Sequence, residues 1–260
     1  MGKEVSYKVS LDRSADGRVA SLRFASDSRL NSLTFGMVKE IQAQITELAE
    51  RDRPRVLVIS GRPDMFTGGA DLDLLVGDDE AAFQTYVDLE YRVFRTVETL
   101  PFVTIASIGG LCIGNGAELA LCCDLRIGTA GCRISFAETK IGFDAPAQRL
   151  ARYVGIGRAK EILYSGRIIS AKEAESLGLL SRVVADDGLA EGTVAFADEY
   201  AAMAPIALRL TKENIEAAYG MDKVQFDAER AAAFTAFRSD DRREGVRAFF
   251  ERRTPRFSGK

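Results

Sequence analysis

The beginning of the chain changes between two hydrophobic periods, which predicts alternating strands and helices. Apolar and polar residues alternate with a period of two in residues 5–12 and 17–24, and the polar turn between them predicts a strand pair. Residues 33–51 carry apolar side chains at helical spacing, with Thr34 as the candidate N-cap. The β-branched run at residues 55–60, bounded by proline and glycine, is typical of a buried strand.

The same alternation continues into the middle of the chain. A helix is predicted over residues 79–100, and strands are predicted over residues 102–108, 123–129 and 133–138. Glycine-rich loops and short helical segments separate these strands. This repeated alternation favours an α/β fold with mainly parallel strand pairing.

From about Pro146 onward, helical spacing dominates. Helices are predicted in residues 149–166, in residues 170–180 and after Gly188, and residues 181–185 are the remaining strand candidate. Apolar stripes on the last helices suit packing on the core and, for some of them, contact with a neighbouring subunit.

Composition narrows the function classes. The chain has 260 residues, of which 47% are apolar and 28% charged, as in an ordinary globular protein of one large domain or a core with an appendage. The formal net charge of −3 gives no electrostatic reason to expect nucleic acid as a partner. Because no apolar run is long enough for a membrane span, we expect no membrane partner either.

The chain contains no histidine. Ser-His-Asp and Cys-His catalysis and histidine-based zinc or iron sites are therefore excluded, and we expect no metal site. Acid–base chemistry must fall to Glu, Asp, Lys, Tyr or Cys. The four cysteines form no C-x-x-C pair and lie mostly in apolar runs. We expect them to be buried and reduced, which favours a cytoplasmic protein.

Two similar loops, at residues 65–72 and 109–119, each follow a predicted strand and lead into a helix. Small residues there leave backbone N–H groups unobstructed at a helix N-terminus. Two such donors that converge on one oxygen form an oxyanion hole, worth about 2.7–4 kcal/mol per donor in a transition state. The second loop is not a dinucleotide-binding fingerprint, because Leu119 stands where the third glycine is required.

Six motifs in order, spread from about residue 10 to residue 257, carry a resemblance to a known family. They read RLNSL, FTGGADL, IGGLCIGNGAELALCCDLRIG, SFAETKIG, ILYSGRIISAKEAESLGLLSRVV and DDRREGVRAFFERRTPRF. The chain resembles the crotonase superfamily, the enoyl-CoA hydratase/isomerase family. The resemblance implies a spiral β/α core over residues 1–195 and a C-terminal helical trimerisation region over residues 196–260. It also implies a homotrimer or a dimer of trimers, an acyl-CoA substrate and no separate cofactor.

The resemblance also assigns catalytic residues. The backbone amides of Ala70 and Asn115 match the oxyanion-hole positions, although such proteins have glycine where this chain has Asn115. Glu118 and Glu138 match the two acids that activate water and protonate the α-carbon, in an order that the sequence leaves open. Without that family, Glu118 would be interpreted as a helix-capping acid and Glu138 as a surface acid.

Further positions match the family's substrate contacts. Relative to hydratases, the segment at residues 142–150 is shortened, and Asp144 within it is either a surface turn residue or a third acid of the site. The expected contacts with CoA or the acyl group are Arg29, Leu30, Gly68, Asp71, Leu72, Phe143 and Asp144.

The resulting hypothesis is an enzyme that adds water across, or removes it from, the 2,3 bond of an acyl-CoA thioester. One alternative within the family is an isomerase, hydrolase or lyase acting on a cyclic or branched acyl-CoA. An alternative of another class is an acyl-CoA-binding protein without catalytic activity.

Overall fold

The computed structural model describes residues 5–51, 53–71, 76–77, 79–219 and 223–260. Its larger sheet has six strands in the order β1-β2-β3-β5-β7-β10. The first pair is antiparallel and the remaining neighbours are parallel, as the alternation of strands and helices predicted. The strands are β1 (Tyr7–Arg13), β2 (Val19–Ser26), β3 (Val56–Ser60), β5 (Val103–Ile108), β7 (Leu125–Thr129) and β10 (Arg182–Val184).

A second sheet of four short strands in the order β4-β6-β8-β9 lies beside the first. Two of its strands fall within the segments predicted as loops, so those predictions were wrong, and β9 lies between the helices predicted over residues 149–166 and 170–180, where no strand was predicted. Three residues are too few to show a period of two, and pairing with a neighbouring chain segment decides their structure. The strands are β4 (Met65–Thr67), β6 (Leu111–Ile113), β8 (Arg133–Ser135) and β9 (Ile168–Ser170).

The two sheets are joined as successive turns of a spiral. Each of the turns β3-β4, β5-β6 and β7-β8 contributes one strand to each sheet and then continues toward a helix. The last turn ends in the 3₁₀ helix η1 (Glu138–Ile141), so the strand predicted to reach residue 138 ends at Ser135. The α/β class with a spiral core is confirmed.

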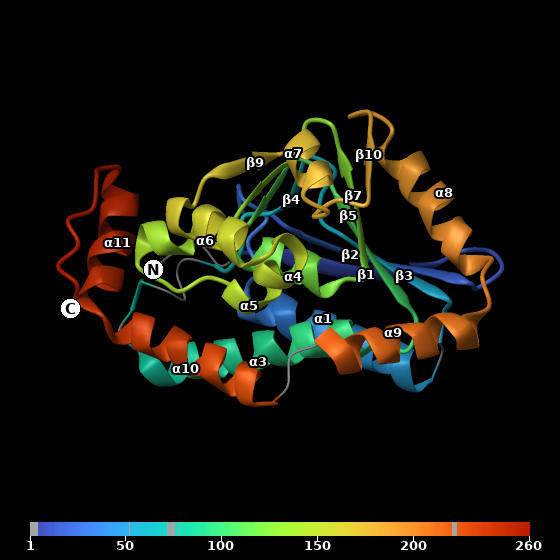
Figure 1. Cartoon of the computed structure of the whole chain (residues 1–260), viewed down its shortest axis with the longest axis horizontal. Coiled ribbons are helices and arrows are strands. Elements are labelled where there is room, and N and C mark those ends of the chain that lie inside the picture. Colours follow the sequence, from blue (N-terminus) through green and yellow to red (C-terminus); the bar gives the residue numbers. More distant parts are fainter. Residues whose placement is uncertain (1–4, 52, 72–75, 78, 220–222) are drawn as a thin grey trace.

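Helices surround these sheets (Figure 1). Thr34 caps α1 as predicted, because its hydroxyl accepts a hydrogen bond from the amide of Met37 at 3.3 Å. The helices are α1 (Phe35–Glu50), α3 (Glu80–Thr99), α4 (Asn115–Cys122), α5 (Ala147–Val154), α6 (Ile156–Ser165), α7 (Ala171–Ser176), α8 (Leu189–Ala201), α9 (Pro205–Tyr219), α10 (Lys223–Arg238) and α11 (Asp240–Glu251).

Both faces of the larger sheet are buried. Val56 and Val58 pack with Phe196 of α8 on one face, whereas Leu57 and Ile59 belong to the main core on the other. This explains why β3 reads as a continuous apolar run rather than an alternating one. The domain boundary expected at residue 195 falls inside α8, which packs on the core sheet.

The C-terminal helices extend past the core. In Figure 1, α9 and α10 run along one side of the molecule, and α10 packs against α3. The last helix, α11, contacts η1, the 3₁₀ helix that follows β8 of the second sheet. None of the described helices is long and apolar enough to cross a membrane. The four cysteines are free and buried.

The close approach of the two chain segments between the sheets generates a prediction. A Cβ on Gly110, whose φ is +60°, would lie 1.8 Å from the carbonyl oxygen of Asp64, so Gly110→Ala forces the backbones apart. Gly178→Ala is the matched control, because Gly178 has φ +74° and nothing within 4 Å of its Cβ position. Positive φ alone costs about 1–2 kcal/mol. Urea unfolding is expected to show a clearly larger loss for Gly110→Ala, and equal losses would contradict the steric argument.

Candidate active site

A cavity of about 470 Å³ opens where the turns after β4 and β6 meet α3, η1 and α11. Nine of the residues that the sequence assigned to the site line this cavity, and they come from four separate parts of the chain. Leu72 lies outside the described residues. Arg29 is described but does not line the cavity, and its side chain is exposed. The nine predicted residues that line the cavity are Leu30, Gly68, Ala70, Asp71, Asn115, Glu118, Glu138, Phe143 and Asp144.

The two small-residue turns meet directly at this cavity. A Cβ on Gly69 would lie 3.3 Å from the amide nitrogen of Asn115 and 2.9 Å from the carbonyl oxygen of Ile113. Gly69 has φ +97°, a conformation that glycine adopts without strain. Asn115 is the first residue of α4, where amides have no partner within the helix. In the described part of the chain, the backbone amides of Ala70 and Asn115 have no hydrogen-bond acceptor.

A buried asparagine holds the neighbouring chain segment against the first turn. Asn31 has φ +51°, accepts a hydrogen bond from the amide of Ser26 at 2.7 Å and donates one to the carbonyl of Phe66 at 2.7 Å. The carbonyl of Leu30 accepts from the amide of Gly68, also at 2.7 Å. These bonds place Leu30 on the cavity wall, as the sequence predicted.

Glu118 is buried and paired. Its carboxylate contacts the guanidinium of Arg149, which also lies 2.7 Å from Glu98 and 3.5 Å from Glu229. Burial raises the pKa of Glu118, and the charge of Arg149 opposes that rise. Glu118 is therefore more than a capping acid at a helix N-terminus.

Glu138 faces the same cavity without a partner. It is 9% exposed, and among the described residues neither carboxyl oxygen has a hydrogen-bond partner. Burial raises the pKa of Glu138 to about 8, so the group is mostly protonated at neutral pH. The interpretation of Glu138 as a surface acid is contradicted by this burial. One oxygen lies 3.4 Å from the Cβ position of Gly114, beside the turn that precedes Asn115.

Two buried residues of the site, Glu90 and Arg149, belong to none of the sequence motifs and were not predicted. Glu90 of α3 lines the cavity, is 2% exposed and accepts a hydrogen bond from the hydroxyl of Tyr86 at 2.8 Å. Its position on the apolar face of α3, three residues after Val87, was the available signal. Arg149 stood in a predicted helix without any feature that distinguished it from a surface arginine.

Asp144 also faces the cavity, which favours its interpretation as a third acid of the site over a surface turn residue. Burial raises its pKa to about 7, and burial likewise raises the pKa of Glu90 to about 7. With Asp71, Glu118 and Glu138, the described cavity wall thus carries five carboxyl groups. Lys140 is the cation among the described lining residues, and its side chain is exposed.

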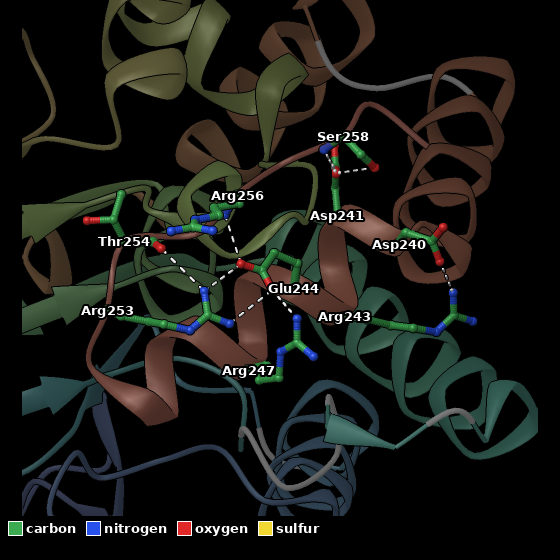
Figure 2. A pocket seen from close by; sticks show the side chains of 9 residues that line it. All are labelled: Asp240, Asp241, Arg243, Glu244, Arg247, Arg253, Thr254, Arg256 and Ser258. Atoms are coloured by element: carbon green, nitrogen blue, oxygen red, sulfur yellow. Dashed lines mark hydrogen bonds and ion pairs between the residues drawn. The ribbon is translucent and has the colours of Figure 1, made fainter.

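A second hollow lies elsewhere and has a different character. Figure 2 shows this space of about 960 Å³ between α11 and the C-terminal tail. Glu244 pairs there with Arg253 at 2.6 Å and with Arg247 at 2.5 Å, and these arginines hold the pKa of Glu244 well below its usual range. Because these charges neutralise one another at an exposed surface, the hollow offers no chemistry comparable to the cavity with buried acids.

The chain is similar to known proteins in both sequence and fold. A model of the enoyl-CoA hydratase/isomerase family matches residues 14–260. The chain is 32% identical to the mitochondrial methylglutaconyl-CoA hydratase of Homo sapiens, over 88% of this chain and 70% of that protein. It is 30% identical to a crotonyl-CoA hydratase of Syntrophomonas wolfei, over 94% of this chain and 95% of that protein. A crystal structure of enoyl-CoA hydratase from Bacillus anthracis superposes with a TM-score of 0.77 at 34% identity, covering 97% of this chain and 99% of the other.

The raised pKa of Glu138 makes stability depend on pH. Its folded pKa of about 8 exceeds the ordinary value of 4.5, so the folded state holds a proton that the unfolded state releases between these values. Its contribution to stability is complete below about pH 4.5 and is lost as pH rises through 8. Relative to Glu138→Gln, the free energy of unfolding of the wild type is expected to fall by up to about 1.4 kcal/mol per pH unit across this range.

Urea unfolding at several pH values between 5 and 8 measures this difference. Glu50→Gln, at the exposed end of α1, is the control and is expected to follow the wild type. Parallel profiles for the wild type and Glu138→Gln would show that Glu138 is ionised in the folded protein, against the expectation.

Proposed function

Since the chain belongs to the enoyl-CoA hydratase/isomerase family, we propose that it hydrates the 2,3 double bond of an acyl-CoA thioester or catalyses the reverse dehydration. One observation carries the proposal: two unpartnered backbone amides lie beside two buried glutamates in one cavity. In this assignment the amides of Ala70 and Asn115 donate to the thioester oxygen. They stabilise the negative charge that collects there when water attacks C3.

The environments of the two glutamates support a division of roles. Burial raises the pKa of both glutamates, but the charge of Arg149, which contacts Glu118, opposes that rise, and we therefore assign to Glu118 the role of the carboxylate that takes a proton from water. The water oxygen then bonds to C3, and the electron pair of the double bond moves toward the thioester oxygen. Glu138, with a pKa of about 8, holds the proton that is delivered to C2. Exchange with solvent restores both groups.

The acidic side chains of the cavity favour a substrate whose acyl group carries no carboxylate. Glu90, Glu138 and Asp144 face the cavity with pKa values of about 7, 8 and 7. A substrate carboxylate among them would lose its hydration, and the raised pKa values mean that this cavity disfavours a further negative charge. The CoA moiety is proposed to lie along Leu30, Gly68 and Asp71, with the exposed Arg29 available to its phosphates.

Turnover in ¹⁸O-labelled water tests the reaction. The wild type is expected to incorporate one labelled oxygen into crotonyl-CoA at C3 and to turn over an enoyl-CoA with a terminal carboxylate far more slowly. Glu118→Gln and Glu138→Gln are each expected to lower kcat by about 10²–10⁴-fold, because each removes an acid–base group while keeping its shape. Retained turnover in both variants would overturn the two-acid mechanism.

The same experiment distinguishes the other activities. Double-bond migration without ¹⁸O incorporation would indicate an isomerase, and release of free CoA would indicate a hydrolase. Binding of acyl-CoA without any turnover of the panel would indicate a protein that binds its ligand without catalysis.

We also propose that the protein assembles as a homotrimer or a dimer of trimers. The helix α9 has no buried residue in the single chain and exposes Ile206, Leu210, Ile215 and Tyr219. Large exposed apolar side chains gathered on one helix are typical of a surface that contacts another protein. Light scattering after size exclusion is expected to give three or six times the chain mass of 28.3 kDa. The double substitution Ile206→Glu and Ile215→Glu is expected to reduce that mass. A wild-type mass equal to that of a single chain would contradict the proposal.

A further inference from the structure

The family resemblance implies glycine at the position of Asn115, and the Asn115 side chain has a specific partner in the structure. Its carboxamide donates a hydrogen bond to one carboxyl oxygen of Glu90, which lies on α3. The other oxygen of Glu90 accepts from the hydroxyl of Tyr86, one helical turn earlier, at 2.8 Å. Glu90 is 2% exposed, so both of its oxygens are committed inside the protein.

This hydrogen bond is made by the first residue of α4, at a helix start that has no side-chain cap. The N-cap of α4 is Gly114, so no side chain caps the helix. A free carboxamide on Asn115 would rotate in the cavity beside its own backbone amide and compete for the thioester oxygen. The bond to Glu90 holds that carboxamide against α3 and leaves the backbone amide accessible.

The same side chains on α3 reach the first amide turn as well. The hydroxyl of Tyr86 lies 3.4 Å from the carbonyl oxygen of Leu33. Leu33 in turn bonds to both sides of Ala70: its amide donates to Gly69 at 2.9 Å, and its carbonyl accepts from Asp71 at 3.2 Å. One helix therefore contacts the supports of both oxyanion-hole donors.

We propose that Glu90 is a positioning residue of the oxyanion hole, which acts through Asn115 by fixing its side chain and the start of α4. The inference rests on the proposed function, because it concerns how the two amides are held for a thioester oxygen. Glu90 itself contacts Asn115 and Tyr86 and takes no part in proton transfer.

A double-mutant cycle tests this role. Glu90→Met removes both bonds at similar volume and is expected to lower kcat by about 10–100-fold with KM within about threefold, because the oxyanion hole acts mainly in the transition state. Glu90→Gln keeps an acceptor for Asn115 and is expected to retain kcat within about threefold. In the Asn115→Gly background, Glu90→Met is expected to change kcat by less than about threefold, because the residue through which Glu90 acts is gone.

Several outcomes would overturn the inference. Equal losses from Glu90→Met in both backgrounds would mean that Glu90 acts on the substrate or on the fold. A large loss in Glu90→Gln would mean that its charge or proton matters, and an unchanged kcat in Glu90→Met would mean that the contact is idle. If Glu90→Met does not fold, Tyr86→Phe removes one of the two bonds to Glu90 together with the contact with Leu33. It is expected to lower kcat by a smaller factor than the 10–100-fold stated above, and by less still when Asn115→Gly is also present.

A measurement without turnover separates failure of this inference from failure of the proposed function. The infrared carbonyl stretch of bound butyryl-CoA, labelled with ¹³C at the thioester carbon, reports polarisation by the two amides. Binding to the wild type is expected to lower this frequency. Glu90→Met is expected to reverse part of this shift, and the double variant Glu90→Met/Asn115→Gly is expected to show the wild-type shift again. A shift with this pattern and no hydration would refute the proposed function alone. Normal hydration with the same shift in wild type and Glu90→Met would refute the positioning role alone.

Discussion

The site depends on the close approach of two backbone segments, residues 63–69 and residues 109–116. A Cβ on Gly109 would lie 2.0 Å from the carbonyl oxygen of Pro63, and one on Gly116 would lie 2.2 Å from Thr67. Side chains at these positions would therefore separate the segments. Because glycine allows the contact, β4 and β6 pair, the second sheet forms, and the amides that follow each strand reach the same cavity.

A second constraint is electrostatic, because one arginine is shared by several buried acids. Arg149 is 2% exposed and contacts Glu98, Glu118 and Glu229. Its guanidinium stays charged, so it opposes the cost of burying Glu118, whereas Glu138 has no such partner. Burial raises the pKa of both carboxyls, but a cation that opposes the rise contacts Glu118 only, so the two groups have different environments, as acid–base chemistry without histidine requires. Because Glu229 lies on α10, the C-terminal helices take part in this balance.

The secondary structure was predicted correctly where a segment is long enough to show a hydrophobic period, and it was missed where distant pairing decides the structure. Strands β2, β3 and β5 and helices α1 and α3 follow from hydrophobic period and, for α1, from the Thr34 cap. The strands β4, β6 and β9 were missed, because three residues carry no usable period and their pairing partners are distant in the chain. Glu118 and Glu138 were found through their motifs and do line the cavity, but Glu90 belongs to no motif and looked like one more acid on a helix.

The sequence by itself determined the α/β class, the two small-residue turns, the exclusion of histidine chemistry and the acids that such a site would use. These properties are local or compositional, so they can be inferred from neighbouring residues alone. Tertiary structure decided which groups face one another: Arg149 with Glu118, Asn115 with Glu90, and Glu138 with no partner among the described residues. Burial and pairing depend on segments far apart in the chain, and they set the protonation of each acid. For that reason the proposed roles of the two glutamates and of Asn115 can be argued only from the tertiary structure.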